Sequence, residues 1–108
     1  MPSKLERIKD GSLRQSLQEA QAALRSGDFA TVVRHSAEAY VELLRRQPEL
    51  LQGQMALRSI LFFPRLGVRL IQNQQGEPEL IWDRDQFIFS EAITYFEFAA
   101  DSLIKNGL

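Results

Sequence analysis

The sequence predicts an all-α fold, a small bundle of about four helices with a short β-hairpin between the third and fourth helices. Apolar residues recur at helical spacing in four segments, and turn residues separate these segments. The chain has 108 residues, so we expect one domain over residues 1–108. Apolar residues make up 44% and charged residues 25% of the chain, as in ordinary folded globular proteins.

The first two helices are expected on either side of a turn at Gly27. Ser12 and Gln15 have the spacing of a capping box, so the first helix should begin near Ser12. Gly27 can adopt the left-handed conformation that ends a helix, and Asp28 can accept hydrogen bonds from the first free N–H groups of the next one. The second helix is predicted over about residues 29–46, with apolar and charged residues on opposite sides.

The third helix and the hairpin are expected between residues 48 and 83. Pro48 fits the first turn of a helix whose apolar pattern continues to Leu61, and Pro64 should end or kink it. Residues 66–83 then contain two short, partly alternating runs, VRLIQ and ELIWD, separated by a loop with Gly and Pro. This pattern predicts a β-hairpin. A helix that continues past Pro64 into a long loop is the alternative.

The last helix is predicted over about residues 86–105, with Asp83 or Asp85 as its N-terminal cap and Asn106–Gly107 after its end. Ile88, Tyr95 and Phe98 lie on a flank of this helix, beside its core stripe. On a helical wheel the core stripe consists of Phe89, Ala92, Ile93, Phe96, Ala99, Ala100, Leu103 and Ile104. So wide an apolar arc needs more cover than one neighbouring helix provides.

Two interpretations explain this flank. The helix can be central in the bundle and packed on two sides within the chain. Alternatively, Ile88, Tyr95 and Phe98 are exposed on the monomer and form an interface, because exposed aromatic patches mark such sites. The partner would then be a second copy of the chain or another protein.

The net charge of −1 is unevenly distributed. Residues 45–76 carry five arginines and one glutamate, whereas residues 77–108 carry seven acidic and two basic residues. Internal pairing of these segments is the simpler interpretation, and contact of Arg58, Arg65 and Arg69 with an anionic partner is the alternative. Arginines beside aromatic residues can bind phosphates or bases, but no lysines accompany them here. Nucleic acid is therefore the less favoured partner.

Residues with catalytic or ligand chemistry are few. The chain has no cysteine, which excludes disulfides and thiolate zinc sites. The single histidine, His35, is expected to contact Glu38 or Glu42 and lacks the second histidine typical of a metal site. The glycines are isolated, so no phosphate-binding loop is present. We therefore predict no catalytic residue, metal ligand or cofactor.

The sequence contains no apolar run near its start that could serve as a secretion signal, and no stretch of the roughly 20 apolar residues that span a membrane. A cytoplasmic location without membrane association is the expectation.

Residues 24–40 read LRSGDFATVVRHSAEAY, a helix end followed by Gly-Asp-aromatic and then small residues at helical spacing. This segment resembles the first helix pair of HEPN domains, which are bundles of four or five helices. The last helix, with Ala92, Phe96, Ala99 and Leu103, is similar to the closing helix of that bundle. The same turn, Gly27 to Phe29, also resembles a single tetratricopeptide motif.

The HEPN resemblance implies dimerisation and a role beside a nucleotidyltransferase or in RNA cleavage, as in toxin–antitoxin systems. The family's ribonuclease motif is Arg, four to six residues, then His. The matching positions before His35 are Ala30, Phe29 and Asp28, so the arginine is missing. The tetratricopeptide resemblance implies binding of a peptide or protein. We therefore expect a non-catalytic protein–protein interaction module, a homodimer, with a HEPN-like RNA- or nucleotide-associated protein as the alternative.

Overall fold

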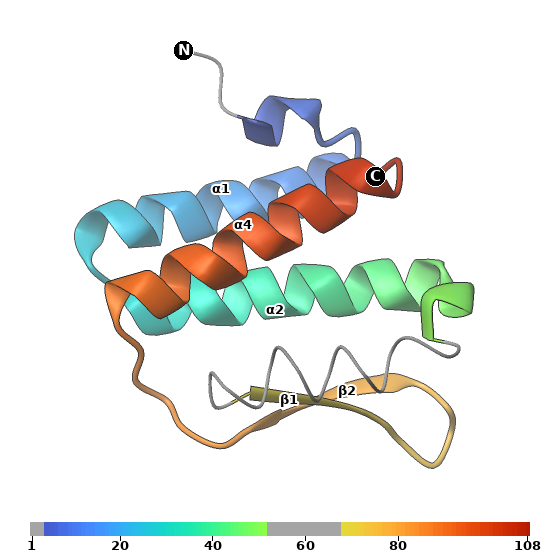
Figure 1. Cartoon of the computed structure of the whole chain (residues 1–108). Helices are drawn as coiled ribbons and strands as arrows, with labels where there is room; N and C mark the ends of the chain where they lie inside the picture. Colours follow the sequence, from blue (N-terminus) through green and yellow to red (C-terminus); the bar gives the residue numbers. More distant parts are fainter. Residues whose placement is uncertain (1–3, 52–67) are drawn as a thin grey trace. The chain divides into compact units, whose positions relative to one another are not determined.

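The computed structural model describes residues 4–51 and 68–108. Within these ranges the chain is mostly helical and has one small antiparallel sheet of two strands, as expected from the sequence. The elements in chain order are η1 (Lys4–Arg7), α1 (Gly11–Ser26), α2 (Phe29–Arg46), η2 (Pro48–Leu51), β1 (Val68–Gln72), β2 (Pro78–Trp82) and α4 (Phe89–Lys105) (Figure 1).

Three α-helices lie in these ranges, against the four predicted for the whole chain. The predicted third helix is represented by its first residues, which form the 3₁₀ helix η2, and the rest of it, with Leu61 and Pro64, lies outside the described residues. The chain divides into two compact units, residues 1–40 with 86–108 and residues 41–85. The expectation of one domain over residues 1–108 stays a prediction.

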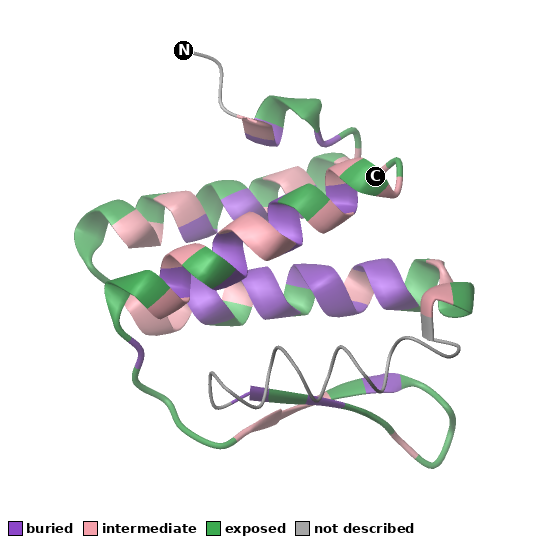
Figure 2. Ribbon diagram, in the orientation of Figure 1, coloured by how far each residue is buried: buried purple, intermediate pink, exposed green. Residues whose placement is uncertain are grey.

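The first unit consists of η1, α1, α2 as far as Tyr40, and α4. α1 and α4 pack against each other, and each helix buries one side (Figure 2). Full burial of a Leu or Val side chain contributes roughly 1.5–3 kcal/mol, so these sides hold the unit together. The buried residues are Leu13, Leu17 and Ala20 of α1, Val32, Val33, Ser36, Ala37, Ala39 and Tyr40 of α2, and Ala92, Tyr95, Phe96, Ala99, Ala100 and Leu103 of α4.

α1 begins close to the predicted position, but its cap is Asp10 rather than Ser12. The Asp10 carboxylate Oδ1 accepts a hydrogen bond from the N–H of Leu13 at 2.9 Å. This carboxylate therefore satisfies one of the free N–H groups in the first turn. The capping box expected of Ser12 and Gln15 was wrong, because the helix starts at Gly11 and places Ser12 inside its first turn.

The turn between α1 and α2 confirms the predicted roles of Gly27 and Asp28. Gly27 has φ +82°, and the N–H of Asp28 donates to the carbonyl of Ala23 at 2.9 Å. The Asp28 carboxylate accepts hydrogen bonds from the hydroxyl of Thr31 at 2.6 Å and from its N–H at 3.3 Å. These two bonds, the hydroxyl one first, lower the pKa of Asp28 below its ordinary value.

The segment η1 was not anticipated, because four residues carry no helical periodicity. Leu5 and Ile8 are both buried, and η1 packs on α1 and α4. The Lys4 ammonium forms ion pairs with Glu97 and Asp101 of α4. Residues near the start of the chain are therefore held against the last helix by the ion pairs of Lys4, and Leu5 and Ile8 are buried in the same unit.

The second unit contains the predicted hairpin, with Val68 opposite Trp82 and Leu70 opposite Leu80. The loop is held by Asn73, whose Oδ1 accepts hydrogen bonds from the N–H groups of Gln75 and Glu77, each at 3.0 Å. Gly76 has φ +79°, a left-handed conformation that glycine adopts without strain in the turn between the strands. The alternative of a long loop over these residues was wrong.

Substitution of Ser36 by alanine should raise the free energy of unfolding by about 1 kcal/mol. The Ser36 hydroxyl is fully buried and has no hydrogen-bond partner among the described residues. A buried hydroxyl without a partner costs roughly 1–3 kcal/mol of desolvation. Chemical denaturation followed by circular dichroism measures the change. The matched control is Ala37→Ser, which adds a hydroxyl at the next buried position and should lower stability. A loss of stability in Ser36→Ala would contradict this account.

Asp28→Asn should make stability less sensitive to acid. Because the pKa of Asp28 is lowered in the folded state, its contribution is present above the ordinary value of 3.8 and is lost as the pH falls through the folded pKa. The amide keeps an oxygen for the cap but does not titrate. Unfolding curves of both proteins from neutral pH to about pH 2 measure the difference. Parallel pH profiles would show that the Thr31 hydrogen bonds do not favour the ionised form.

Candidate protein interaction site

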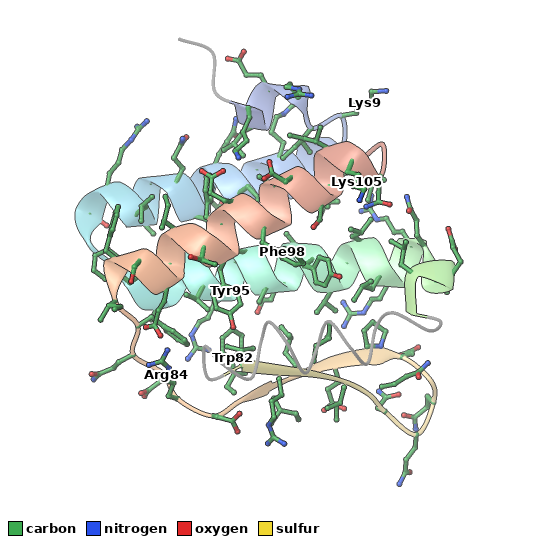
Figure 3. All side chains as sticks on the ribbon, in the orientation of Figure 1. Lys9, Trp82, Arg84, Tyr95, Phe98 and Lys105 are labelled. Atoms are coloured by element: carbon green, nitrogen blue, oxygen red, sulfur yellow. The ribbon has the colours of Figure 1, made fainter. Side chains whose placement is uncertain are left out.

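The structure separates the three residues predicted to form an interface. Tyr95, labelled on α4 in Figure 3, is only 1% exposed. Its ring lies edge-on to that of Phe87, with 6.4 Å between centroids. Phe98 is half-buried, with its ring 4.8 Å from that of Tyr40. Ile88 is 62% exposed. Tyr95 thus lies in the core, as the first of the two interpretations has it, and Ile88 is the one of the three that lies mostly in solvent.

Phe89 was assigned to the core stripe and is instead 54% exposed. The reason is that α4 begins at Phe89 and not near residue 86, so Phe89 stands in the first turn, at the end of the helix. Its ring packs edge-on against Phe29, the first residue of α2, with 5.9 Å between centroids. Both helices start at the same end of the first unit (Figure 1).

Phe29, Ile88 and Phe89 together are called the end patch below. Two of its members are large apolar side chains, adjacent in the chain and more than half exposed. The third, Phe29, is half-buried and supports the ring of Phe89. An aromatic pair of this geometry contributes about 0.5–1.5 kcal/mol of stability beyond the contribution of its buried area. This contact holds the ring of Phe89 in place.

The start of α4 has an unusual cap. Ile88 occupies the N-cap position, has extended backbone angles and offers no side-chain acceptor to the free N–H groups of the first turn. The Glu91 carboxylate Oε1 instead accepts a hydrogen bond from the N–H of Ile88 at 3.0 Å. Asp83 and Asp85, the predicted caps, lie outside the helix. Ser, Asp or Asn at this position would stabilise the helix by roughly 1 kcal/mol relative to an aliphatic residue.

Of the three arginines proposed as anion contacts, the structure describes Arg69. Arg58 and Arg65 lie outside the described residues. Arg69 forms a bidentate ion pair with Asp83 across the hairpin: Nε lies 2.9 Å from Oδ2 and Nη2 lies 3.1 Å from Oδ1. This pair joins the basic middle segment to the acidic last segment, which is the internal pairing expected from the charge distribution.

The partners of His35 lie on α1 and not on its own helix, α2. Its Nδ1 lies 3.4 Å from the Ser16 hydroxyl and 3.8 Å from Glu19 Oε2, both on α1, so the expected contact with Glu38 or Glu42 was wrong. In a catalytic triad the serine and the carboxylate use different ring nitrogens, and here both approach the same one. The geometry fits a contact between helices. Within residues 4–51 and 68–108, no group of three or more His, Asp or Glu could hold a metal ion.

In the described part of the chain no helix has the length and apolar character needed to cross a membrane. Comparisons with models of protein families, with curated proteins and with solved structures found no match to this chain. The HEPN-like and tetratricopeptide-like resemblances therefore stay predictions.

The Arg69–Asp83 pair should contribute little to stability. Both side chains are about half exposed, and exposed ion pairs are typically worth below about 1 kcal/mol. A double-mutant cycle with Arg69→Ala, Asp83→Ala and the double variant, measured by chemical denaturation at low and high salt, gives the coupling energy. We expect a value below about 1 kcal/mol that decreases with salt. A coupling energy of several kcal/mol would contradict this prediction and would mean that the hairpin depends on this ion pair for its stability.

Proposed function

We propose that this chain is a non-catalytic protein–protein interaction module that self-associates through the end patch. The observation that carries the proposal is the exposure of Ile88 and Phe89, two adjacent large apolar side chains that the fold leaves more than half in solvent. Exposed apolar patches mark interaction sites, and aromatic residues are enriched at their centres.

The position of Ile88 strengthens the argument. A helix N-cap is a place where a polar residue stabilises the fold, and an exposed isoleucine there costs stability and leaves apolar surface in water. Residues that oppose folding in this way are concentrated at functional sites. Burial of Ile88 against a partner would offset this cost.

The end patch is also held rigid before any partner binds. The Phe29–Phe89 contact fixes one ring, and the Glu91–Ile88 hydrogen bond fixes the backbone at the start of α4. A preformed apolar surface loses little conformational entropy on association, so more of the burial energy contributes to affinity. Arg69 and His35, two other residues singled out from the sequence, have partners within the chain. Within residues 4–51 and 68–108, Ile88 and Phe89 are the large apolar side chains that are more than half exposed.

Ile88→Asp tests the proposal, because it should remove self-association and stabilise the monomer at once. An aspartate can accept hydrogen bonds at the N-cap, so the free energy of unfolding should rise by about 0.5–2 kcal/mol, measured at a dilution at which the wild type is monomeric. Light scattering on a size-exclusion column gives the mass. We expect a dimer for the wild type and a folded monomer for Ile88→Asp.

The matched control is Ile71→Asp, which introduces the same charge at an exposed isoleucine of the hairpin. Its mass should equal that of the wild type. A monomeric wild type across the concentration range would overturn self-association. A dimer that persists in both Ile88→Asp and Phe89→Ser would show that the end patch is not its interface.

A further inference from the structure

The turn between α1 and α2 lies at the same end of the first unit as the start of α4 (Figure 1), and it carries two opposite charges. Arg25 is in the last turn of α1, and Asp28 directly precedes Phe29. Both side chains are exposed. Gly27, in its left-handed conformation, lies between them and reverses the chain. The end of the first unit that carries the end patch therefore also carries one positive and one negative group from the same short turn.

Both groups can bind a partner. The hydrogen bonds from Thr31 lower the pKa of Asp28, so this carboxylate is ionised at neutral pH. Each of its oxygens accepts one bond from Thr31 and retains a further lone pair. Arg25 has five N–H donors and forms no ion pair within the described residues. The two side chains do not pair with each other, although they are three positions apart.

This arrangement suits a second copy of the same chain. In a two-fold interface, residue i of one copy contacts residue j of the other, and j contacts i. A surface with one cation and one anion is complementary to itself under this symmetry. We infer that two copies pack their end patches together about a two-fold axis, with Arg25 of each copy paired with Asp28 of the other. This inference rests on the proposed function and adds the residues that select the partner.

The expected roles of the two kinds of residue differ. The apolar side chains at the centre supply most of the affinity, because they are removed from water. The two charges supply selectivity, since like charges facing each other disfavour a wrong arrangement. Two such pairs form in each dimer, and they should make dimerisation weaker at high salt.

Exchange of charges between two proteins tests the inference. Arg25→Glu alone places two acidic groups opposite each other in the dimer, and Asp28→Lys alone places two basic groups opposite each other. Each should raise the dissociation constant of its own homodimer by about tenfold or more. When the two variants are mixed in equal amounts, both cross-copy pairs are restored with reversed polarity in one of them. The mixture should form a heterodimer whose dissociation constant is close to that of the wild-type dimer. Light scattering and native mass spectrometry measure this.

Circular dichroism of each variant alone controls for folding, because Asp28→Lys also removes the cap of α2. The heterodimer carries the same weakened cap, so its formation cannot come from a change in folding. Homodimers of Arg25→Glu with wild-type affinity would overturn the inference while leaving the end patch in place. A mixture that shows no preference for the heterodimer would overturn it as well. Loss of the dimer in Ile88→Asp separates these outcomes from failure of the proposed function.

Discussion

The packing of α4 against the α1–α2 pair is the interaction on which the first unit depends. Two helices joined by a tight turn bury one stripe each and leave the groove between them open, and a third helix is needed to close it. α4 supplies that helix with a nearly continuous row of buried side chains. α4 also binds η1 through the ion pairs of Lys4 with Glu97 and Asp101, so every other helix of the first unit contacts α4. Short helices are marginal alone in water, and this mutual burial is what holds them.

The same packing creates the candidate site. Helices cover one another along their sides, but the residues of a first turn project at the end, where no neighbour covers them. Phe89 and Ile88 occupy this end of α4, and Phe29 occupies the same end of α2. The core and the end patch are therefore products of one arrangement, and the patch can be altered at its tip without disturbing the buried rows below it.

The features that could be predicted from the sequence are those determined by a few neighbouring residues. The turn at Gly27 and Asp28 is one example, since a left-handed glycine and a capping carboxylate act within one helical turn. The hairpin loop at Asn73 and Gly76 is another. Both depend on local backbone geometry. The end of α4 at Lys105, directly before Asn106 and Gly107, could be predicted for the same reason.

The features that could not be predicted depend on residues far apart in the chain. Asp83 pairs with Arg69 on the opposite strand, and α4 starts six residues after Asp83 with no carboxylate as its cap. This later start exposes Phe89, while Tyr95 is buried and its ring lies edge-on to that of Phe87. A helical wheel gives the angle of a residue around the axis, but not the extent of cover along it. For this reason the helical wheel placed Tyr95 on the exposed flank and Phe89 in the core stripe, whereas the structure buries Tyr95 and exposes Phe89.

The first unit is assembled from residues 1–40 and 86–108, and this has a consequence for the newly made protein. The ribosome adds about 5–20 residues per second, so residues 41–85 take roughly 2 to 9 s to be translated. During that interval the stripes of α1 and α2 are present in the nascent chain without the helix that covers them. A nascent chain of this kind is open to chaperones and to premature association, and it reaches its native packing only when the last helix emerges.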